Sequence, residues 1–316
     1  MKSRHLVDEA LLPLLAQFPT HVLSHDNLAE LRATRRAFLP AVAPNSINLA
    51  IIEIDGPDGD KVPLHVYTPA ASLRRPLGCI FHIHGGGYVL GAPDRNEFFL
   101  RPLAEELGCV VISVGYRLAP EHPHPAPVED CYAGLSWTVA HSPELGICPR
   151  RIGLMGESAG GGLAAALALM VRDRQQAKLA FQILTYPMID DRTCIAEPHP
   201  FAGDYIWTLG NNRFAWTALL GQEPGSEGVS PYAAAARADD LSGLPPTYIA
   251  TGALDLFVDE NLEYARRLIR AGVPTELHVY PGAFHGFDIV PSAPIAEQAI
   301  AERKAALRRF LSEAVE

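Results

Sequence analysis

The stretch Gly156-Glu157-Ser158-Ala159-Gly160 is the part of this sequence that decides the fold. An apolar run at 151–155, typical of a short buried strand, comes before it, and an Ala- and Leu-rich run at 163–172, typical of a helix, follows. A serine at the sharp turn between a strand and a helix is known as a nucleophile elbow. Glycines on both sides remove Cβ atoms that would clash, and the hydroxyl projects at the positive end of the helix. The alternative is an ordinary glycine-rich turn.

Strand and helix patterns alternate on both sides of this stretch. Strand patterns at 47–54 and 62–68 flank a Gly-Pro-Asp-Gly turn and predict an antiparallel hairpin. From Cys79 onward, continuous apolar strands alternate with helices, which predicts a mostly parallel sheet covered on both faces. These strands are expected at 79–83, 109–114, 152–155, 179–184, 247–251 and 276–280. The helices between and after them are expected at 97–107, 128–140, 163–172 and 259–270 and in a C-terminal segment ending near Glu316.

Two segments lie outside this alternation. Near the N-terminus we expect a helix over 7–18 and a second over 27–38, with Asp26 as its N-cap and Pro40 as its end. The segment from 190 to about 230 contains no convincing strand and is rich in aromatic residues: Phe201, Tyr205, Trp207, Phe214 and Trp216. Such an insertion predicts a cap over the carboxyl ends of the strands, where α/β proteins bind ligands. An ordinary pair of surface helices is the alternative.

The composition excludes two classes of partner. The 316 residues are 48% hydrophobic and 20% charged, the net charge is −10, and the sequence pI is about 5.6. A nucleic-acid partner needs a basic surface, which this acidic balance argues against. No apolar run approaches the length of about 20 residues that spans a bilayer, and Asp8 and Glu9 interrupt the apolar core that a signal peptide needs. We therefore expect no nucleic-acid or membrane partner.

The cysteines favour a reducing compartment. Their number is odd and their spacing matches no metal site: Cys79, Cys109, Cys131, Cys148 and Cys194. We expect all five to be reduced structural residues of a cytoplasmic protein.

A nucleophilic serine needs a base that takes its proton. The chain has 12 histidines, and His285 is the candidate because it lies in a loop directly after the last predicted strand, between Gly282 and Gly286. It also comes after a nucleophile and an acid, which is the chain order of one large class of hydrolases. His278 lies inside that strand and favours a structural role.

The base needs an acid that orients it, and two aspartates are candidates. Asp255 lies just past the strand expected at 247–251, in a loop that can lean toward His285. Asp259 is the second choice, because it falls where the next helix begins and is expected to be its N-cap.

A third requirement is a set of donors for the developing oxyanion. The sequence His84-Gly85-Gly86-Gly87 follows a predicted strand, and its glycines let backbone N–H groups face a substrate oxygen. The N–H of Ala159, next after the serine, supplies another donor, and each such donor contributes about 3 kcal/mol. A phosphate-binding loop is the alternative, but it would need a following Lys and Ser or Thr, and residues 88–90 supply neither.

Taken together, these motifs resemble the bacterial hormone-sensitive-lipase-like (family IV) esterases of the α/β-hydrolase superfamily. The resemblance rests on 84–87, Tyr116 to His122, 156–161, Asp255 and 284–287, and it extends from about Val62 to the end. It implies a catalytic triad of Ser158, Asp255 and His285, and oxyanion donors at Gly85, Gly86 and Ala159. One departure is Glu157, where many members have Asp; it leaves the chemistry unchanged but bears on substrate preference.

The resemblance also implies a domain organisation and an activity. The fold class is α/β, with a mostly parallel central sheet, helices on both faces and a helical cap. Residues 1–45 are expected to form N-terminal cap helices, 46–189 and 231–316 the two parts of the catalytic domain, and 190–230 the cap insertion. The expected activity is that of a cytoplasmic serine carboxylesterase, which hydrolyses small-molecule esters of short- to medium-chain acids through an acyl-enzyme intermediate.

Some alternatives stay open at this stage. An amidase or a dedicated deacetylase is a second hypothesis. A small-molecule receptor is a third, and the presence of His285 argues against it, because receptors of this fold have lost that histidine. We expect no cofactor and no metal, and we allow for a homodimer.

Overall fold

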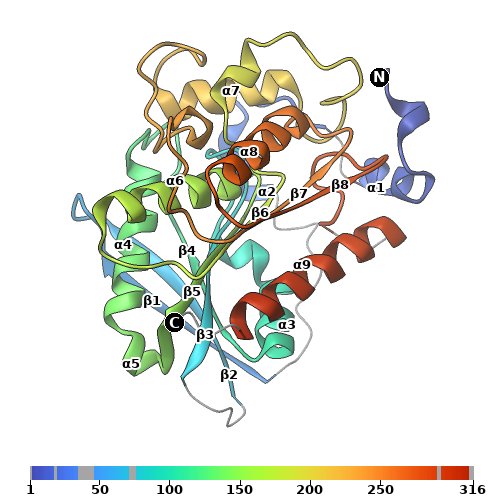
Figure 1. Cartoon of the computed structure of the whole chain (residues 1–316). Helices are drawn as coiled ribbons and strands as arrows, with labels where there is room; N and C mark the ends of the chain where they lie inside the picture. The colour runs from blue at the N-terminus through green and yellow to red at the C-terminus, as the bar shows by residue number, and fades with distance from the viewer. Residues whose placement is uncertain (1, 18–19, 35–45, 71–75, 290–292, 313–316) are drawn as a thin grey trace.

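Eight strands form one sheet through the centre of the molecule, in the order β1-β2-β4-β3-β5-β6-β7-β8 (Figure 1). The computed structural model describes residues 2–17, 20–34, 46–70, 76–289 and 293–312. From β4 to β8 neighbouring strands are parallel, whereas β2 is antiparallel to both β1 and β4. The strands are β1 Ile47–Asp55, β2 Lys61–Pro69, β3 Leu77–Ile83, β4 Val110–Val114, β5 Ile147–Glu157, β6 Gln182–Thr185, β7 Thr247–Gly252 and β8 Thr275–Tyr280. The predicted hairpin and the mostly parallel sheet are confirmed.

Helices cover both faces of this sheet. One core lies between the sheet and helices α4, α6 and α8, and a second lies between the sheet and helices α3 and α9. Because the central strands are covered on both sides, every residue of β3 and β4 is buried, which is why their sequences are apolar apart from His82 and Ser113. The helices are α1 Leu12–Gln17, α2 Leu28–Thr34, α3 Glu97–Leu107, α4 Ala126–Ala140, α5 Ser142–Leu145, α6 Ala159–Arg174, α7 Leu209–Leu220, α8 Val258–Arg270 and α9 Pro294–Ser312.

Several predicted boundaries differ from the structure. Helix α6 begins at Ala159, not at 163, because the three glycines that follow lie in its first turn despite their low helix propensity. The prediction of Asp26 as an N-cap is wrong: α2 begins at Leu28, and the N–H of Leu31 donates to the carbonyl of Asn27. The predicted end of that helix lies outside the described residues.

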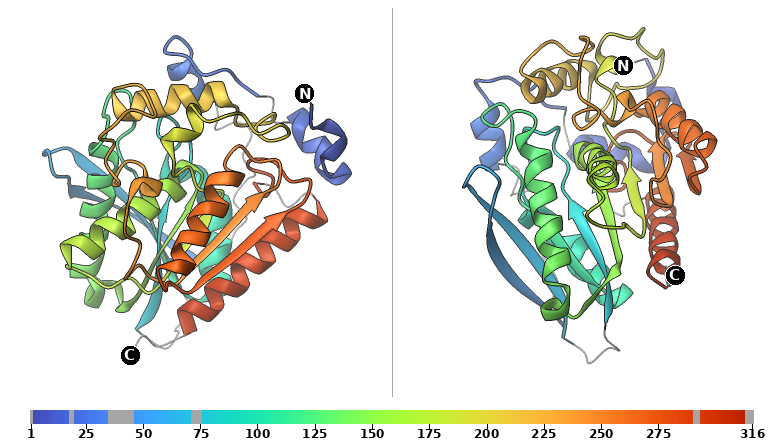
Figure 2. Two further views of the ribbon diagram at one scale, coloured as in Figure 1. Left: turned by 45° about the horizontal axis from the view of Figure 1, so that its top comes forward. Right: turned by 60° about the vertical axis from the view of Figure 1, so that its left-hand side comes forward.

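The N-terminal segment and the insertion lie side by side above the carboxyl ends of the strands (Figure 2). The N–H of Leu23 donates to Asn211 Oδ1 at 2.9 Å, and Asn211 Nδ2 donates to the carbonyl of His21 at 2.7 Å. The insertion contains a short 3-10 helix, Asp191–Cys194, and helix α7. Two segments far apart in the sequence therefore share one layer.

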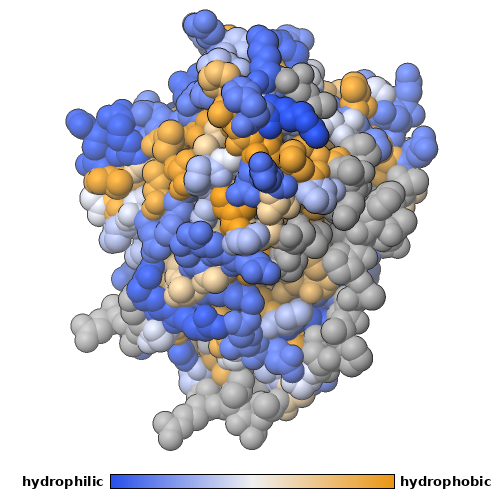
Figure 3. Space-filling view, turned by 90° about the vertical axis from the view of Figure 1, so that its right-hand side faces the viewer, coloured by the Kyte–Doolittle hydropathy of each residue, from blue (hydrophilic) through white to orange (hydrophobic). Residues whose placement is uncertain are grey.

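The molecular surface on the side of β8 and α9 is mixed in character. Hydrophobic residues gather in the upper half of this face and hydrophilic residues cover much of the lower half (Figure 3). Apolar atoms contribute much of any folded protein's surface, so this mixture needs no special explanation. Among the helices of the described residues, none combines the length and the apolar character that crossing a membrane requires. All five cysteines are free thiols, as predicted.

Candidate active site

Ser158 lies at the turn between β5 and α6, with a backbone φ of 56°. This conformation is strained for a residue with a side chain, and it persists only where its surroundings enforce it. A Cβ on Gly156 would lie 2.2 Å from the carbonyl oxygen of Gly160, and one on Gly160 would lie 2.0 Å from that of Ile83. Both glycines are therefore sterically required. The turn is stabilised by the N–H of Ser158, which donates to the carbonyl of Thr185 at 2.9 Å.

The structure brings together the serine, the histidine and the aspartate singled out from the sequence. Nε2 of His285 lies 2.9 Å from Oγ of Ser158, and Nδ1 of His285 lies 2.8 Å from Oδ2 of Asp255. All three side chains are buried. The other carboxylate oxygen of Asp255 accepts from the N–H of Phe257 at 2.9 Å, so both oxygens of this side chain are held in place.

Asp259 does not take part in this arrangement. Phe257 occupies the N-cap position of α8, and Asp259 lies inside the first turn with an exposed side chain. The prediction of Asp259 as the N-cap of this helix is therefore wrong. The negatively charged side chain of Asp259 is still favourable in the first turn, because it lies near the positive end of the helix.

The glycine loop after β3 lies directly beside the serine. A Cβ on Gly85 would be 3.4 Å from Cβ of Ser158 and only 2.8 Å from the carbonyl oxygen of Glu157. Gly86 has a φ of 129°, and a Cβ there would clash with the carbonyl of Leu90 at 2.2 Å. Ala159 opens α6, where the first N–H groups of a helix have no partner inside it. The loop and the helix start thus offer N–H groups next to Ser158.

His84 holds this loop in shape. Its ring stacks on Tyr116 at 4.2 Å, and the Tyr116 hydroxyl donates to the His84 carbonyl at 2.8 Å. Burial lowers the pKa of His84 to about 4, so the imidazole is neutral at pH 7. Nδ1 of this ring lies 3.0 Å from the carbonyl oxygen of Gly85, which only accepts, so Nδ1 carries the proton and donates it.

Beneath the serine, the partly exposed Glu157 forms a pair with the buried His82. Oε2 of Glu157 lies 3.0 Å from Nε2 of His82, and Nδ1 of the same ring lies 2.9 Å from Oγ of Ser113. Burial raises the pKa of Glu157, but its charge interaction and hydrogen bond with His82 outweigh burial and hold the pKa below its ordinary value. The residue that departs from the family pattern is thus tied to the sheet below the elbow.

A second buried network lies under the loop of His285, and it was not predicted from the sequence. Asp288 accepts from the Tyr186 hydroxyl at 2.7 Å and from Arg303 of α9 at 2.8 Å. The Tyr186 ring in turn packs edge-on against His285, with 4.7 Å between ring centroids. Burial lowers the pKa of Arg303, but the charges of Asp288 and Glu157 outweigh it and raise the pKa. This network links helix α9 to the histidine loop.

Of the five aromatic residues of the insertion, Trp207 alone has a ring contact with a residue of the predicted triad. Its ring centroid is 6.3 Å from that of His285. The others pack elsewhere: Phe201 on His5 and His199, Tyr205 on Phe284, Phe214 on His25 and Trp216 on Tyr88. Of the five rings, Trp207 is thus the one that packs against the predicted triad.

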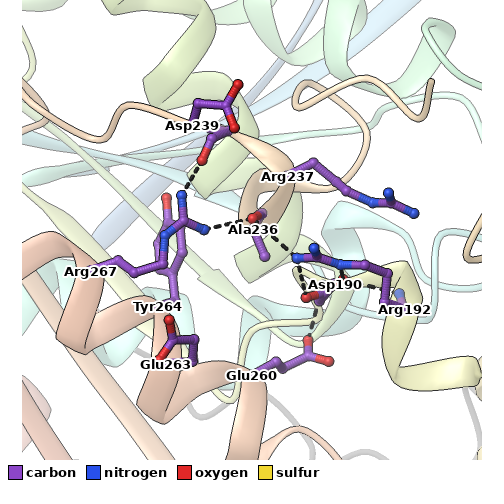
Figure 4. A pocket seen from close by; sticks show the side chains of 10 residues that line it. Asp190, Arg192, Ala236, Arg237, Asp239, Glu260, Glu263, Tyr264 and Arg267 are labelled. Carbon is purple, nitrogen blue, oxygen red and sulfur yellow. Dashed lines mark hydrogen bonds and ion pairs between the residues drawn. The ribbon is translucent and has the colours of Figure 1, made fainter. Parts of the chain in front are cut away.

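Two cavities of about 390 Å³ lie away from Ser158. One is lined by charged side chains of α8 and of the segments around 190 and 237 (Figure 4). Its arginines already have partners: Arg192 pairs with Asp190, Arg237 pairs with Asp191, and Arg267 donates to the carbonyls of Ala236 and Ala238. This cavity is therefore a junction between structural elements, where carboxylates and backbone carbonyls hold the arginines. Within the described ranges, no three His, Cys, Asp or Glu side chains are grouped to hold a metal ion.

Comparison with known proteins agrees with this geometry. Residues 80–289 match the family described as alpha/beta hydrolase fold. The carboxylesterase NlhH of Mycobacterium tuberculosis is 34% identical over 319 residues, which cover 98% of each chain. An arylesterase of Saccharolobus solfataricus is 32% identical over 227 residues, 72% of this chain and 73% of the relative. The solved structure of a bacterial heroin esterase superposes with a TM-score of 0.91 at 39% identity, over 98% of this chain and 99% of the other.

The chain therefore belongs to the α/β-hydrolase fold family. Its resemblance to the bacterial hormone-sensitive-lipase-like carboxylic ester hydrolases, predicted from the motifs, is confirmed.

Proposed function

We propose that this chain is a serine carboxylesterase in which Ser158 is the nucleophile, His285 the general base and Asp255 the residue that orients His285. The observation that carries the proposal is the continuous chain of contacts from Asp255 through His285 to Ser158, at 2.8 and 2.9 Å. It runs through three buried side chains, and a nucleophile with a base and an orienting acid in hydrogen-bond reach is the arrangement that acyl transfer requires.

The first half of the reaction forms an acyl-enzyme. In the form that acts as a base, His285 donates its Nδ1 proton to Asp255, and Nε2 takes the Ser158 hydroxyl proton while Oγ attacks the ester carbonyl carbon. The carbonyl oxygen becomes an oxyanion that accepts from the N–H groups of Gly85, Gly86 and Ala159. Each such donor contributes about 3 kcal/mol to stabilising the transition state. The tetrahedral intermediate collapses, the bond to the alcohol oxygen breaks, and Nε2 gives its proton to the leaving alcohol.

The second half repeats these steps with water. Nε2 of His285 takes a proton from a water molecule whose oxygen attacks the acyl carbon, and the same three N–H groups stabilise the second oxyanion. Collapse releases the carboxylic acid and returns the proton to Ser158. The buried carboxylate of Asp255 stabilises the imidazolium that forms in each half, because a charge interaction is stronger where water is excluded.

A test of this assignment uses Ser158→Ala. Loss of the nucleophile is expected to reduce turnover of 4-nitrophenyl butyrate by several orders of magnitude, on the order of 10⁶ where the residues act as a unit. A fluorophosphonate probe should label the wild type and not the variant, and the exposed Ser242→Ala provides a matched control that keeps both properties. Retention of more than a tenth of the activity in Ser158→Ala would show that the nucleophile is wrong.

The proposal extends to the acyl group, for which we expect short to medium chains of about four to eight carbons. The family resemblance is the main support, and the names of the relatives refer to carboxylic and aryl esters. A buried methylene adds about 0.8 kcal/mol of affinity, so the preference should rise with chain length until the pocket is full. An amidase or deacetylase is the alternative, and the matching anilides measured beside the esters separate the two.

The same proposal includes the domain organisation. Residues 1–45 and 190–230 act together as a cap, and 46–189 with 231–316 form the catalytic domain. Support comes from the hydrogen bonds between His21 or Leu23 and Asn211, and from the contact of Trp207 with His285.

A cytoplasmic location is also proposed, on the strength of five free thiols. A homodimer, for which the sequence analysis allows, would have twice the 34.2 kDa mass of one chain in sedimentation equilibrium.

A further inference from the structure

The indole of Trp207 lies against the glycine loop beside the serine. A Cβ on Gly87 would be 2.1 Å from Cη2 of this indole, so the last glycine of the loop leaves the space that the ring occupies. The same ring lies 6.3 Å from the His285 imidazole between centroids, at an interplanar angle of 40°. Trp207 is itself buried. One side chain of the insertion thus touches both the oxyanion loop and the base.

Trp207 is held in this position by groups from three segments. Its Nε1–H donates to Oδ1 of the buried Asn212 at 3.2 Å, and Nδ2 of Asn212 donates to Sγ of Cys194 at 3.2 Å. Its backbone N–H donates to the carbonyl of Tyr205 at 2.6 Å and closes a three-residue turn centred on Ile206. The N–H of Ile206 donates in turn to Thr20 Oγ1 at 3.1 Å.

The turn that places Trp207 is strained. Ile206 has a φ of 61°, which is a rare and costly conformation for a β-branched residue. Strain of this kind persists only where the surroundings enforce it, and it gathers at functional sites. Here the surroundings are two acceptors, Thr20 Oγ1 for the N–H of Ile206 and the carbonyl of Tyr205 for the N–H of Trp207, and together they hold the indole over the loop.

The position of Trp207 beside His285 determines which part of an ester it meets. Nε2 of His285 must give its proton to the leaving alcohol oxygen, so that oxygen lies within hydrogen-bond reach of Nε2. The alcohol portion therefore extends from a point beside the imidazole, whereas the acyl portion extends from the carbonyl carbon in another direction. Tyr186 and Phe257 also contact this imidazole, at 4.7 and 5.2 Å between centroids, and come from loops that follow β6 and β7. Trp207 alone of these three rings belongs to the insertion.

We propose that Trp207 sets the size limit for the alcohol portion of the ester substrate. This inference rests on the proposed esterase function and deepens it. A bulky alcohol would have to displace an indole that is hydrogen-bonded and packed on Gly87. A small alcohol can depart after its protonation without moving the indole. Trp207 is thus a specificity-determining residue.

The experiment compares Trp207→Ala and Trp207→Phe with the wild type on two pairs of esters. Phenyl acetate and 1-naphthyl acetate share the acyl group and differ in alcohol size at similar leaving-group acidity. The second pair, 4-nitrophenyl acetate and hexanoate, shares the alcohol and differs in the acyl group. Phe201→Ala is the matched control, because Phe201 belongs to the same insertion, is exposed, and packs its ring on the imidazoles of His5 and His199. Ratios of kcat/KM within one enzyme cancel differences in the amount of folded protein.

Trp207→Ala should raise the naphthyl-to-phenyl ratio by about tenfold or more, because even a methylene-sized change in a pocket alters discrimination by 10-fold to 200-fold. In Trp207→Ala the hexanoate-to-acetate ratio should change less than about threefold. Trp207→Phe should raise the naphthyl-to-phenyl ratio by a smaller factor. Phe201→Ala should change neither ratio. If Trp207→Ala does not fold, Trp207→Phe decides the matter by the same ratio.

Two results would overturn the inference about Trp207 and leave the proposed esterase function intact. One is an unchanged alcohol ratio in folded Trp207 variants, and the other is a change confined to the acyl ratio. If instead the wild type hydrolyses none of the four esters, or hydrolyses them as well after Ser158→Ala, the proposed function fails and takes this inference with it.

Discussion

Asp255 and Asp259 are only four residues apart, yet their surroundings give them different chemistry. Asp255 is fully buried, and both of its oxygens are occupied, one by His285 and one by the N–H of Phe257. Asp259 is exposed in the first turn of α8. Ser158 shows the same dependence on surroundings, since its φ of 56° is tolerated only between two glycines. The role open to each of these residues therefore depends on the backbone conformation and the burial of its position.

The prediction at this scale compares Asp255→Asn with Asp259→Asn. Asn at position 255 favours the wrong imidazole tautomer and is expected to reduce kcat by about 10⁴, whereas Asn at 259 should leave kcat within about twofold. Steady-state kinetics on 4-nitrophenyl butyrate measures both. Equal kinetics for the two variants would show that Asp255 does not orient the histidine.

Helix α9 and the histidine loop are joined through one buried network. Arg303 of α9 reaches Asp288, three residues after His285, and Asp288 in turn accepts from Tyr186, whose ring contacts His285. Tyr186 has a φ of 36°, and its N–H donates to the carbonyl of Ala250 at 2.6 Å, so its position is also enforced by its neighbours. The C-terminal helix thus has a part in positioning the loop, although it lies on the far side of the sheet from α6.

The prediction at the scale of elements concerns this pair. Arg303→Met removes the charged partner of the buried Asp288 carboxylate, leaves it the Tyr186 hydroxyl, and is expected to lower the free energy of unfolding by about 3–5 kcal/mol. Adding Asp288→Asn should recover part of that loss, because the two residues are coupled by about 0.5–3 kcal/mol. Urea unfolding of the single and double variants measures the coupling.

A matched control lies on the same helix. Arg308 pairs with Glu106 at the surface, and Arg308→Met should cost less than about 1 kcal/mol. If the effects of Arg303→Met and Asp288→Asn were simply additive, the two side chains would not form the coupled pair that their geometry indicates.

Two cores and a layer above the strand ends make up the whole molecule. Helices on both faces leave the carboxyl edge of the parallel strands as the place where Ser158, Asp255 and His285 meet, each from the loop after a different strand. The N-terminal segment and the insertion lie above that edge, joined by hydrogen bonds such as that from Leu23 to Asn211. Substrates must therefore reach Ser158 past side chains contributed by distant parts of the chain.

The prediction for the whole molecule concerns acyl chain length. A site covered by this layer has a limited depth, so kcat/KM should rise from acetate, reach its maximum between butyrate and octanoate, and fall for longer chains, once further methylenes add no burial. The measurement is kcat/KM on 4-nitrophenyl esters from acetate to palmitate, above and below the concentration at which the substrate forms an oil phase. A maximum at palmitate, or activation at the interface, would contradict a covered site.

The sequence alone determined the sheet and the three residues that meet at Ser158. Both depend on local physics: continuous apolar runs are what a doubly covered strand needs, and the glycines at 156 and 160 are what a strained serine turn needs. His285 and Asp255 followed from their places in the loops after β8 and β7. The start of α6 did not follow from the sequence, because the glycines that open this helix are poor helix formers, yet α6 begins at Ala159.

Only the tertiary structure decided which distant side chains surround that site. Five aromatic residues of the insertion looked alike in the sequence, and one of them, Trp207, lies on the loop and the base. The network of Arg303, Asp288 and Tyr186 joins residues as far apart as 117 positions in the chain, with no repeating pattern between them. Periodicity and glycine placement report on neighbours along the chain, whereas these contacts depend on how whole elements pack, and no local pattern encodes that.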